Sequence, residues 1–398
     1  MKRMVLVVAL VALRVWAAPP ASGLDAERLA RIPARMKAFV ERGSIAGAVT
    51  LVARHGTVGS VEAVGYQNLE TKTPMRTDTI FQIMSMTKPV TAVGIMLLLE
   101  EGRLGLNDPV ERHLPEFRGQ WVIDSRPDEK TRVLKKSPRA ITIKDLLTHT
   151  SGMTGMPPEG MKEVIFKFDH TLAEAVALYS QQPLEFEPGK KWSYSNPGIA
   201  TLGRIIEVVS GMPYEKFLEE RIFKPLGMKD SFFFPPEEKK ARISMLYKLE
   251  GGQLKRAGAE ALAGDAAEYR KGAKYPCPEC GLYSTAADLA ALYQTMLNGG
   301  IHQGKRLLSK ASVEAMTTVH TGELRPSYGL GWAVSQGPGA LLSLGSPGSF
   351  GHGGAFGTYG WMDPKKDLLG VFLIQRTTGG TSEETNAFQA LANAAVVD

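Results

Sequence analysis

The order of strand and helix patterns along this 398-residue chain restricts its fold more than any other feature. Five segments alternate or run continuously apolar over strand lengths, two near the N-terminus and three near the C-terminus: 45–56, 58–67, 328–334, 357–363 and 367–376. A helical pattern over 24–43 precedes the first pair, and another helix is expected from about Glu383. The sequence therefore predicts an α/β fold in which one antiparallel sheet, flanked by helices, is built from both chain ends.

Helical patterns joined by Pro- and Gly-rich loops fill the middle of the chain. We accordingly predict an α/β domain whose first part spans 19–120 and whose second part spans 281–398. Residues 121–280 are predicted to form a mainly helical insertion, an all-helical lobe beside the sheet.

The first residues have the pattern of a secretory signal peptide, predicted over 1–18. Lys2 and Arg3 form a positive start, an apolar run follows over 5–13, and Ala17 lies at the expected cleavage point. The nine apolar residues of that run are too few for a membrane-spanning helix, which needs about twenty. The mature protein is therefore expected in the periplasm or outside the cell.

Charge and cysteine positions limit the partners of the mature protein. Cleavage near Ala17 removes three cations and no acids, which lowers the formal charge from +6 to +3. No block of lysine and arginine is interleaved with aromatic residues, so nucleic acid is not expected as a partner. No cysteine precedes Cys277, which excludes a lipid-modified N-terminal cysteine and a stable membrane anchor after signal removal.

The two cysteines, Cys277 and Cys280, form a single CxxC motif. One such pair supplies half of a structural zinc site, and no second pair or suitably spaced histidines complete it. In an exported protein a local disulfide is favoured over two free thiols. We predict the disulfide and no metal site.

Ser85 and Lys88 lie three residues apart at the start of a long apolar run, 81–102. If a helix begins at Ser85, both side chains share one face of its first turn. Partial burial of Lys88 would lower its pKa and make it a base, while the helix N-terminus would offer N–H donors to an oxyanion. The alternative is that Ser85 only caps the helix and Lys88 reaches solvent, and the spacing alone favours this alternative.

Two Tyr-x-Asn motifs and three His-x-Gly motifs are candidates for the remaining chemistry. Tyr66 ends a predicted strand, whereas Tyr194 lies in a loop bounded by Gly and Pro, which is the more typical place for chemistry. Among the histidines, only His352 has glycines near enough for a substrate to approach a strand backbone. His302 and His320 are interpreted as surface loop residues.

Six longer motifs occur in one order along the chain: FQIMSMTKPVTAVGIMLLLEEGRLGLNDPV, ITIKDLLTHTSGM, FEPGKKWSYSNPGIATLGRIIEVVSG, FKPLGMKDSFF, GLYSTAADLA and FGHGGAFGTYGWMDP. Together they resemble the serine β-lactamase-like superfamily, in particular its class C β-lactamases and family VIII carboxylesterases. The resemblance covers most of the chain from about residue 25. It implies the β-lactamase/transpeptidase-like fold, with an active site between an α/β lobe and a helical lobe.

The resemblance also implies a role for individual residues. Ser85 would be the acylated nucleophile, Lys88 would activate it, and Tyr194 would be the general base and later the proton donor. Asn196 would hold the acyl side of the substrate. The oxyanion hole would consist of the backbone N–H groups of Ser85 and Ala355, the latter on an edge strand. An ammonium near Tyr194 would favour its phenolate, so Lys88 and Tyr194 are expected to titrate as a coupled unit, and the choice between them as base stays open.

One motif departs from the lactamase pattern. Class C enzymes carry Lys-Thr-Gly where this chain has His352, Gly353 and Gly354. A mostly neutral histidine provides a weaker contact to the carboxylate of a β-lactam, and glycine provides none. The alternative for His352 is a structural hydrogen bond at the strand edge.

The sequence leaves several functions open. The first is an exported carboxylesterase that acts on small, short-acyl esters, with weak β-lactam hydrolysis as a side activity. The alternatives are an amidase such as a D-aminopeptidase or D,D-peptidase, a class C-like β-lactamase, a penicillin-binding protein without turnover and a nonenzymatic binding module. The expected partner is a small ester or amide, and no cofactor is expected.

Overall fold

The computed structural model describes residues 22–156, 168–257, 270, 272–337, 344–377 and 382–397. The predicted signal peptide, 1–18, lies outside these residues. In the described part of the chain, no helix has both the length and the apolar character needed to cross a membrane.

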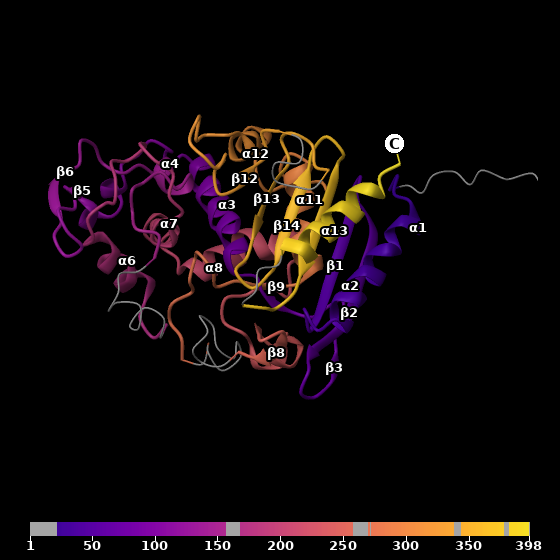
Figure 1. The fold of residues 1–398 in the computed structure, drawn as a ribbon. Helices are drawn as coiled ribbons and strands as arrows, with labels where there is room; N and C mark the ends of the chain where they lie inside the picture. The colour runs from indigo at the N-terminus through magenta and orange to yellow at the C-terminus, as the bar shows by residue number, and fades with distance from the viewer. Residues whose placement is uncertain are drawn as a thin grey trace, which may run out of the picture.

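A seven-stranded antiparallel sheet forms the centre of the α/β part, in the order β12-β13-β14-β15-β1-β2-β3 (Figure 1). Its strands are β1 (Gly47–Arg54), β2 (Thr57–Asn68), β3 (Thr73–Pro74), β12 (Ala333–Val334), β13 (Phe350–Gly353), β14 (Tyr359–Asp363) and β15 (Leu368–Leu373). The N-terminal β1 pairs directly with the C-terminal β15, from Val49 opposite Leu373 to Arg54 opposite Leu368. The prediction of one antiparallel sheet built from both chain ends is therefore confirmed.

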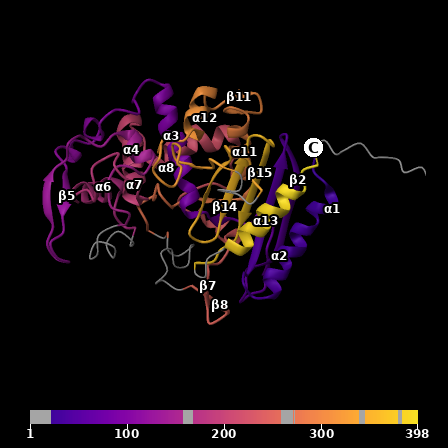
Figure 2. The ribbon, with the colours of Figure 1, turned by 45° about the horizontal axis from the view of Figure 1, so that its top comes forward.

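Helices cover both faces of this sheet, which is why β1 is buried along its whole length. One face packs against α1 (Ala26–Leu29), α2 (Arg31–Glu41) and α13 (Ser382–Ala394), seen beside the sheet in Figure 2. The opposite face packs against α3 (Thr87–Glu100) and α11 (Ala286–Leu297). Alternate β1 residues enter the two cores: Ala48 and Val52 the first, Val49 and Leu51 the second.

The middle of the chain forms a second lobe, which extends away from the sheet in Figure 1. Its helices are α4 (Ile143–Leu147), α6 (Leu172–Ser180), α7 (Asn196–Ser210), α8 (Tyr214–Leu218) and α9 (Lys224–Leu226). The prediction that the insertion is all-helical is wrong, because it also contains the hairpins β5 (Trp121–Ser125) with β6 (Val133–Lys136), and β7 (Tyr247–Glu250) with β8 (Gln253–Arg256). Strand β6 is exposed at every position, so it lacks the alternation that marks a half-buried strand.

Helix α3 lies between the two lobes, with α7 and α8 on one side and the sheet on the other. It begins at Thr87 after a 3₁₀ turn, Met84–Met86, so the predicted helix start at Ser85 is two residues early. The remaining short elements are β4 (Phe81–Gln82), β9 (Tyr283–Ser284), β10 (Ile301–His302), β11 (Lys305–Arg306) and α12 (Lys310–Thr317). Strand β4 pairs with β9 and so ties the segment before Ser85 to the segment that follows the cysteines.

Candidate active site

Ser85 lies in the 3₁₀ turn between β4 and α3, where its side chain is half-buried. The preceding Met84 has a φ of 51°, in the left-handed region that residues other than glycine rarely adopt. The hydroxyl of Thr87 donates a hydrogen bond of 2.6 Å to the carbonyl of Met84 and holds this turn closed. Such strain is typical of positions that the surrounding structure fixes for function. The side chain of Ser85 does not cap the helix, so that alternative is wrong.

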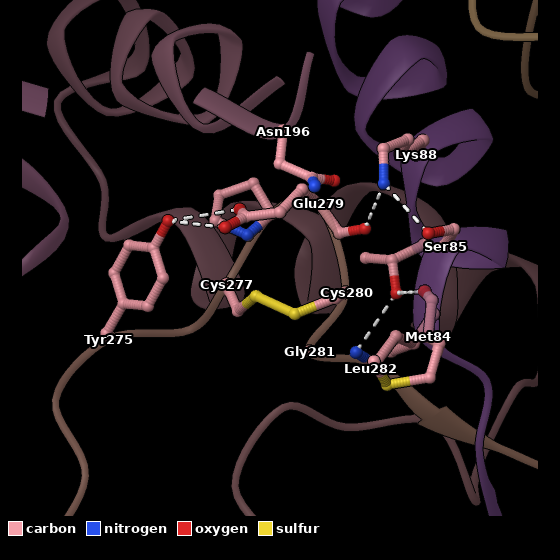
Figure 3. The surroundings of a disulfide bond; sticks show 12 residues. Met84, Ser85, Lys88, Asn196, Tyr275, Cys277, Glu279, Cys280, Gly281 and Leu282 are labelled. Carbon is pink, nitrogen blue, oxygen red and sulfur yellow. Dashed lines mark hydrogen bonds between the residues drawn. A yellow bond between two sulfur atoms is a disulfide. The ribbon is translucent and has the colours of Figure 1, made fainter. Parts of the chain in front are cut away.

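Lys88 is fully buried on the first turn of α3, with an exposed fraction of 0%. Its Nζ lies 3.0 Å from Ser85 Oγ and donates to the backbone carbonyl of Glu279 at 2.7 Å (Figure 3). Burial lowers the pKa of Lys88 from 10.5 to about 7, and the negative charge of Glu279 opposes this decrease. Near neutral pH a large fraction of Lys88 is therefore an uncharged amine that can accept a proton. The alternative of a lysine that reaches solvent is wrong.

Tyr194 reaches the same place from the loop that precedes α7. The centroid of its ring lies 4.7 Å from Lys88 Nζ. Burial raises the pKa of Tyr194 above its ordinary value of 10.0, although a hydrogen bond with Ser85 acts in the opposite direction. The prediction of a phenolate is therefore wrong. Burial disfavours the charged form of Tyr194 more than a nearby ammonium favours it, so Tyr194 is a neutral phenol at neutral pH. The charged group that acts on the pKa of Lys88 is the buried carboxylate of Glu279.

His149, which no sequence motif had indicated as a site residue, holds the Tyr194 loop in place. Its carbonyl accepts from Ser193 N at 2.9 Å, and its Nδ1 accepts from Ser195 N at 3.1 Å. The rings of His149 and Tyr194 lie 4.5 Å apart. Burial and the charge of Lys88 keep the pKa of His149 well below 6.5, so it stays neutral. The available sequence signal was its position inside the motif ITIKDLLTHTSGM, between short polar residues and before a glycine.

Asn196 is the first residue of α7, two residues after Tyr194. Its Nδ2 donates to the carbonyl of Gly155 and to the sulfur of Met156, each at 3.2 Å. The structure thus brings Asn196 to the site, and its role toward the acyl group stays a prediction.

His352 lies on β13 and is buried. Its Nδ1 donates to the carbonyl of Gly353 at 2.7 Å, so Nε2 accepts from the hydroxyl of Tyr328 at 3.1 Å. Burial and the charge of Lys88 lower the pKa of His352 to about 3. His352 is therefore neutral, and both of its ring nitrogens are hydrogen-bonded within the protein. The weak contact with an anion that was considered for His352 is not available, because the ring carries no positive charge. Tyr328 was not anticipated from the sequence.

The glycines after His352 let this segment approach the nucleophile turn closely. A Cβ on Gly354 would lie 2.3 Å from the carbonyl oxygen of Ile83, and the hydroxyl of Thr358 donates to that same oxygen at 3.0 Å. Only glycine fits there. Ala355 follows in an exposed turn after β13, so its predicted place on an edge strand is wrong, although the turn packs against the residues that precede Ser85.

Cys277 and Cys280 form a disulfide, as predicted. The alternatives of a zinc half-site and of two free thiols are wrong for this state, because both sulfurs are bonded to each other. Glu279 lies between the two cysteines, and the same turn therefore supplies the carbonyl that accepts from Lys88 (Figure 3).

A cavity of about 610 Å³ lies in the helical lobe, away from this site. It is lined by Phe223, Phe232, Phe233 and Phe234 with lysines and glutamates at its rim, and none of the predicted site residues contributes to it. This cavity is therefore distinct from the candidate active site.

Comparison with known proteins agrees with this geometry. A family model described as Beta-lactamase matches residues 32–394. The chain belongs to the beta-lactamase family. Esterase EstB of Burkholderia gladioli is 31% identical over 386 residues, which cover 90% of this chain and 93% of EstB. A putative D-alanyl-D-alanine carboxypeptidase of Salmonella enteritidis is 29% identical over 90% of this chain and 85% of its own length.

Two solved structures have the same fold as this chain. EstCE1, a hydrolase with promiscuous acyltransferase activity, superposes with a TM-score of 0.76 at 24% identity and covers 93% of this chain and 99% of its own. An octameric penicillin-binding protein homologue from Pyrococcus abyssi gives a TM-score of 0.70 at 27% identity, with 92% of this chain and 76% of that chain covered. The protein is a serine hydrolase of the beta-lactamase family.

Proposed function

We propose that this serine hydrolase is a carboxylesterase that cleaves small, short-acyl esters through an acyl-enzyme on Ser85. The observation that carries the proposal is the position of Lys88, whose buried Nζ lies 3.0 Å from Ser85 Oγ. A lysine whose pKa is lowered to about 7 can take the proton of a serine hydroxyl near neutral pH. In the esterase relative EstB, 31% of the aligned residues are identical, which supports the ester as substrate class.

In the proposed acylation, the proton of the Ser85 hydroxyl passes to neutral Lys88 while Oγ attacks the ester carbonyl carbon. The negative charge that forms on the carbonyl oxygen is stabilised by the backbone N–H groups of Ser85 and Ala355. The packing of Gly354 against Ile83 holds the two segments that carry these groups together.

Tyr194 is proposed as the proton donor to the leaving alcohol. Because burial raises its pKa, Tyr194 keeps its proton at neutral pH and can release it only to a strong base such as an alkoxide. The ammonium of Lys88, with Nζ 4.7 Å from the centre of the tyrosine ring, then returns a proton to Tyr194. Water attacks the acyl group in the second half of the reaction, with the same groups acting in reverse.

The environment of His352 favours neutral esters over carboxylate-bearing lactams. Its two ring nitrogens are engaged by Gly353 and Tyr328, and its pKa of about 3 leaves it uncharged. A β-lactam carboxylate would therefore find no positive charge at this position. An ester without a carboxylate does not need such a charge, so its binding is not weakened by the neutral histidine.

An amidase acting on D-amino acid peptides is the second candidate. The observation in its favour is the Salmonella relative with the printed name of a putative D-alanyl-D-alanine carboxypeptidase. An amide nitrogen is a poorer leaving group than an alkoxide and needs its proton earlier, a role that the neutral phenol of Tyr194 could also fill.

A panel of substrates on one purified sample tests these proposals. We would measure kcat/KM for p-nitrophenyl esters of increasing acyl length, for nitrocefin and for D-alanine p-nitroanilide. The esterase proposal expects the short esters to be hydrolysed best, and a higher kcat/KM for the anilide would favour the amidase.

A Ser85→Ala variant is the control for this panel. It should fold normally and lose ester hydrolysis by about three orders of magnitude or more, since the acyl-enzyme can no longer form. Full activity of the folded variant would refute the assignment of Ser85.

A further inference from the structure

The segment around the disulfide, which we call the disulfide turn (residues 276–282), packs directly on the helix that carries Lys88. Three hydrogen bonds join the two along one side of α3: Thr91 Oγ1 to the carbonyl of Pro278 (2.7 Å), Lys88 Nζ to the carbonyl of Glu279 (2.7 Å) and Leu282 N to Thr87 Oγ1 (3.2 Å). On its other side, Leu282 accepts from Ile83 N at 3.0 Å, two residues before Ser85. The turn therefore contacts both the nucleophile segment and the base.

The backbone of the disulfide turn is tightly closed. The N–H groups of Cys280 and Gly281 both donate to the carbonyl of Cys277, at 2.9 and 2.7 Å. A Cβ on Gly281 would lie 1.8 Å from the carbonyl oxygen of Pro276, so no other residue fits there. The Cys277–Cys280 bond links the same two positions covalently. The direction of the Glu279 carbonyl is thus set by the closure of this turn.

That carbonyl orients the proposed base. A neutral amine has two N–H donors and one lone pair. When one N–H of Lys88 is bonded to the carbonyl of Glu279, the lone pair can face Ser85 Oγ, 3.0 Å away. Without the carbonyl, the flexible four-carbon side chain of lysine would sample other directions.

The carboxylate of Glu279 lies on the far side of the turn. Both of its oxygens accept from the hydroxyl of Tyr275, at 2.8 and 3.0 Å, as Figure 3 shows. Burial raises the pKa of Glu279 to about 7, while the charges of Lys88 and Arg270 act to lower it. Burial raises the pKa values of two further phenols, those of Tyr179 and Tyr214, and the negative charge of this carboxylate raises them further. The other groups that face Lys88 are neutral near pH 7: Tyr194, His149 and His352.

We propose that the Cys277–Cys280 disulfide, whose two cysteines are buried, is a positioning element that holds the Glu279 carbonyl against Lys88, so that breaking the bond slows hydrolysis. This inference rests on the proposed esterase function and adds a positioning element to the same site. A dithiol reductant such as dithiothreitol supplies two electrons and two protons. The S–S bond breaks, two cysteine thiols form, and dithiothreitol is oxidised to its cyclic disulfide.

The experiment compares the wild-type protein with a Cys277→Ala/Cys280→Ala variant in p-nitrophenyl acetate hydrolysis across the neutral pH range. Loss of orientation at the base should lower kcat by about ten- to a hundredfold and leave KM within about twofold, because substrate binding does not depend on Lys88. A merely structural disulfide would lower the melting temperature and leave kcat and its pH profile unchanged in the folded variant. That result would overturn the proposal.

Two further measurements keep the test decisive. If the double variant does not fold, folded wild-type protein is reduced with dithiothreitol, and the reductant is then removed under anaerobic conditions. The free thiols of this sample are counted and its kcat is measured. Two free thiols with an unchanged kcat overturn the proposal. A Glu279→Gln variant keeps the carbonyl and the disulfide but removes the charge that raises the pKa of Lys88. Its acid limb should move to lower pH, whereas the cysteine variant should lose kcat at every pH.

The outcomes also separate this inference from the proposed function. A wild-type protein that hydrolyses no ester refutes the esterase proposal. A wild-type esterase whose folded cysteine variant is equally fast refutes only the role of the disulfide turn.

Discussion

Replacement of Lys88 by methionine should abolish esterase activity and, at the same time, stabilise the protein at neutral pH. Lys88 is wholly buried, and its pKa falls from 10.5 to about 7 on folding. Between those two pH values the unfolded chain binds a proton that the folded chain does not, so the free energy of unfolding rises with pH in this window. At 1.36 kcal/mol for each pH unit, the destabilisation reaches about 5 kcal/mol toward neutral pH and disappears above the unfolded pKa.

Methionine removes this destabilisation while it keeps most of the side-chain volume. The variant loses the hydrogen bond from Lys88 Nζ to the Glu279 carbonyl, which costs about 1 to 3 kcal/mol for a buried acceptor left without its donor. We therefore expect a net gain of about 2 to 4 kcal/mol in the free energy of unfolding at pH 7. The gain should shrink and reverse near the pKa of a free lysine.

Urea denaturation followed by tryptophan fluorescence, at neutral and at alkaline pH, measures both values. Hydrolysis of p-nitrophenyl acetate should fall by about a hundredfold or more in the same variant, because the positioned base is gone. Lys88→Ala is the matched control. It should be equally inactive but less stable than the methionine variant by about 2 to 5 kcal/mol, since it leaves a cavity in the core. A methionine variant that is less stable at neutral pH than at alkaline pH, relative to wild type, would refute the reasoning.

Other expectations concern the proton donor, the specificity position, the pH profile and export. Tyr194→Phe should lower kcat for short esters of alkyl alcohols, measured by pH-stat titration of the released acid, by about a hundredfold; unchanged kcat for these esters in the folded variant would reject Tyr194 as proton donor. His352→Lys with Gly353→Thr should raise the nitrocefin-to-ester ratio of kcat/KM by about tenfold, because the new lysine can make a charge-assisted contact with the lactam carboxylate. A Cβ at Gly353 would lie 3.1 Å from the Tyr359 ring, which limits the gain. An unchanged ratio in a folded variant contradicts a role of this position in specificity. Wild-type kcat/KM should increase with pH through an acid limb near the Lys88 pKa of about 7, and a flat profile would exclude Lys88 as base. Intact mass spectrometry of periplasmic protein should show a chain cut near Ala17, and an uncut chain would reject the signal peptide.

Local patterns in the sequence predicted the antiparallel sheet and the pair Ser85 and Lys88, but they missed His149 and Tyr328 at the site. The apolar alternation that predicted strands at both ends also determines their pairing, because each strand has to bury its apolar residues between helices on both faces. The three-residue spacing of Ser85 and Lys88 places both at the start of α3 but left open whether Lys88 faces Ser85 or solvent, whereas the CxxC spacing suffices for a local disulfide. The β5–β6 hairpin in the helical lobe was missed because β6 has no buried face to leave a periodic signal.

Only the tertiary structure decided the chemical state of these residues. Protonation depends on how many protein atoms replace water around a group, and those atoms come from segments far apart in sequence. Lys88 loses its charge because α3 is enclosed between the lobes, and Tyr194 keeps its proton for the same reason, so the phenolate suggested by residue types does not form. The partner of Lys88 is a backbone carbonyl 191 residues further along the chain, at Glu279, and a backbone atom has no signature in the sequence.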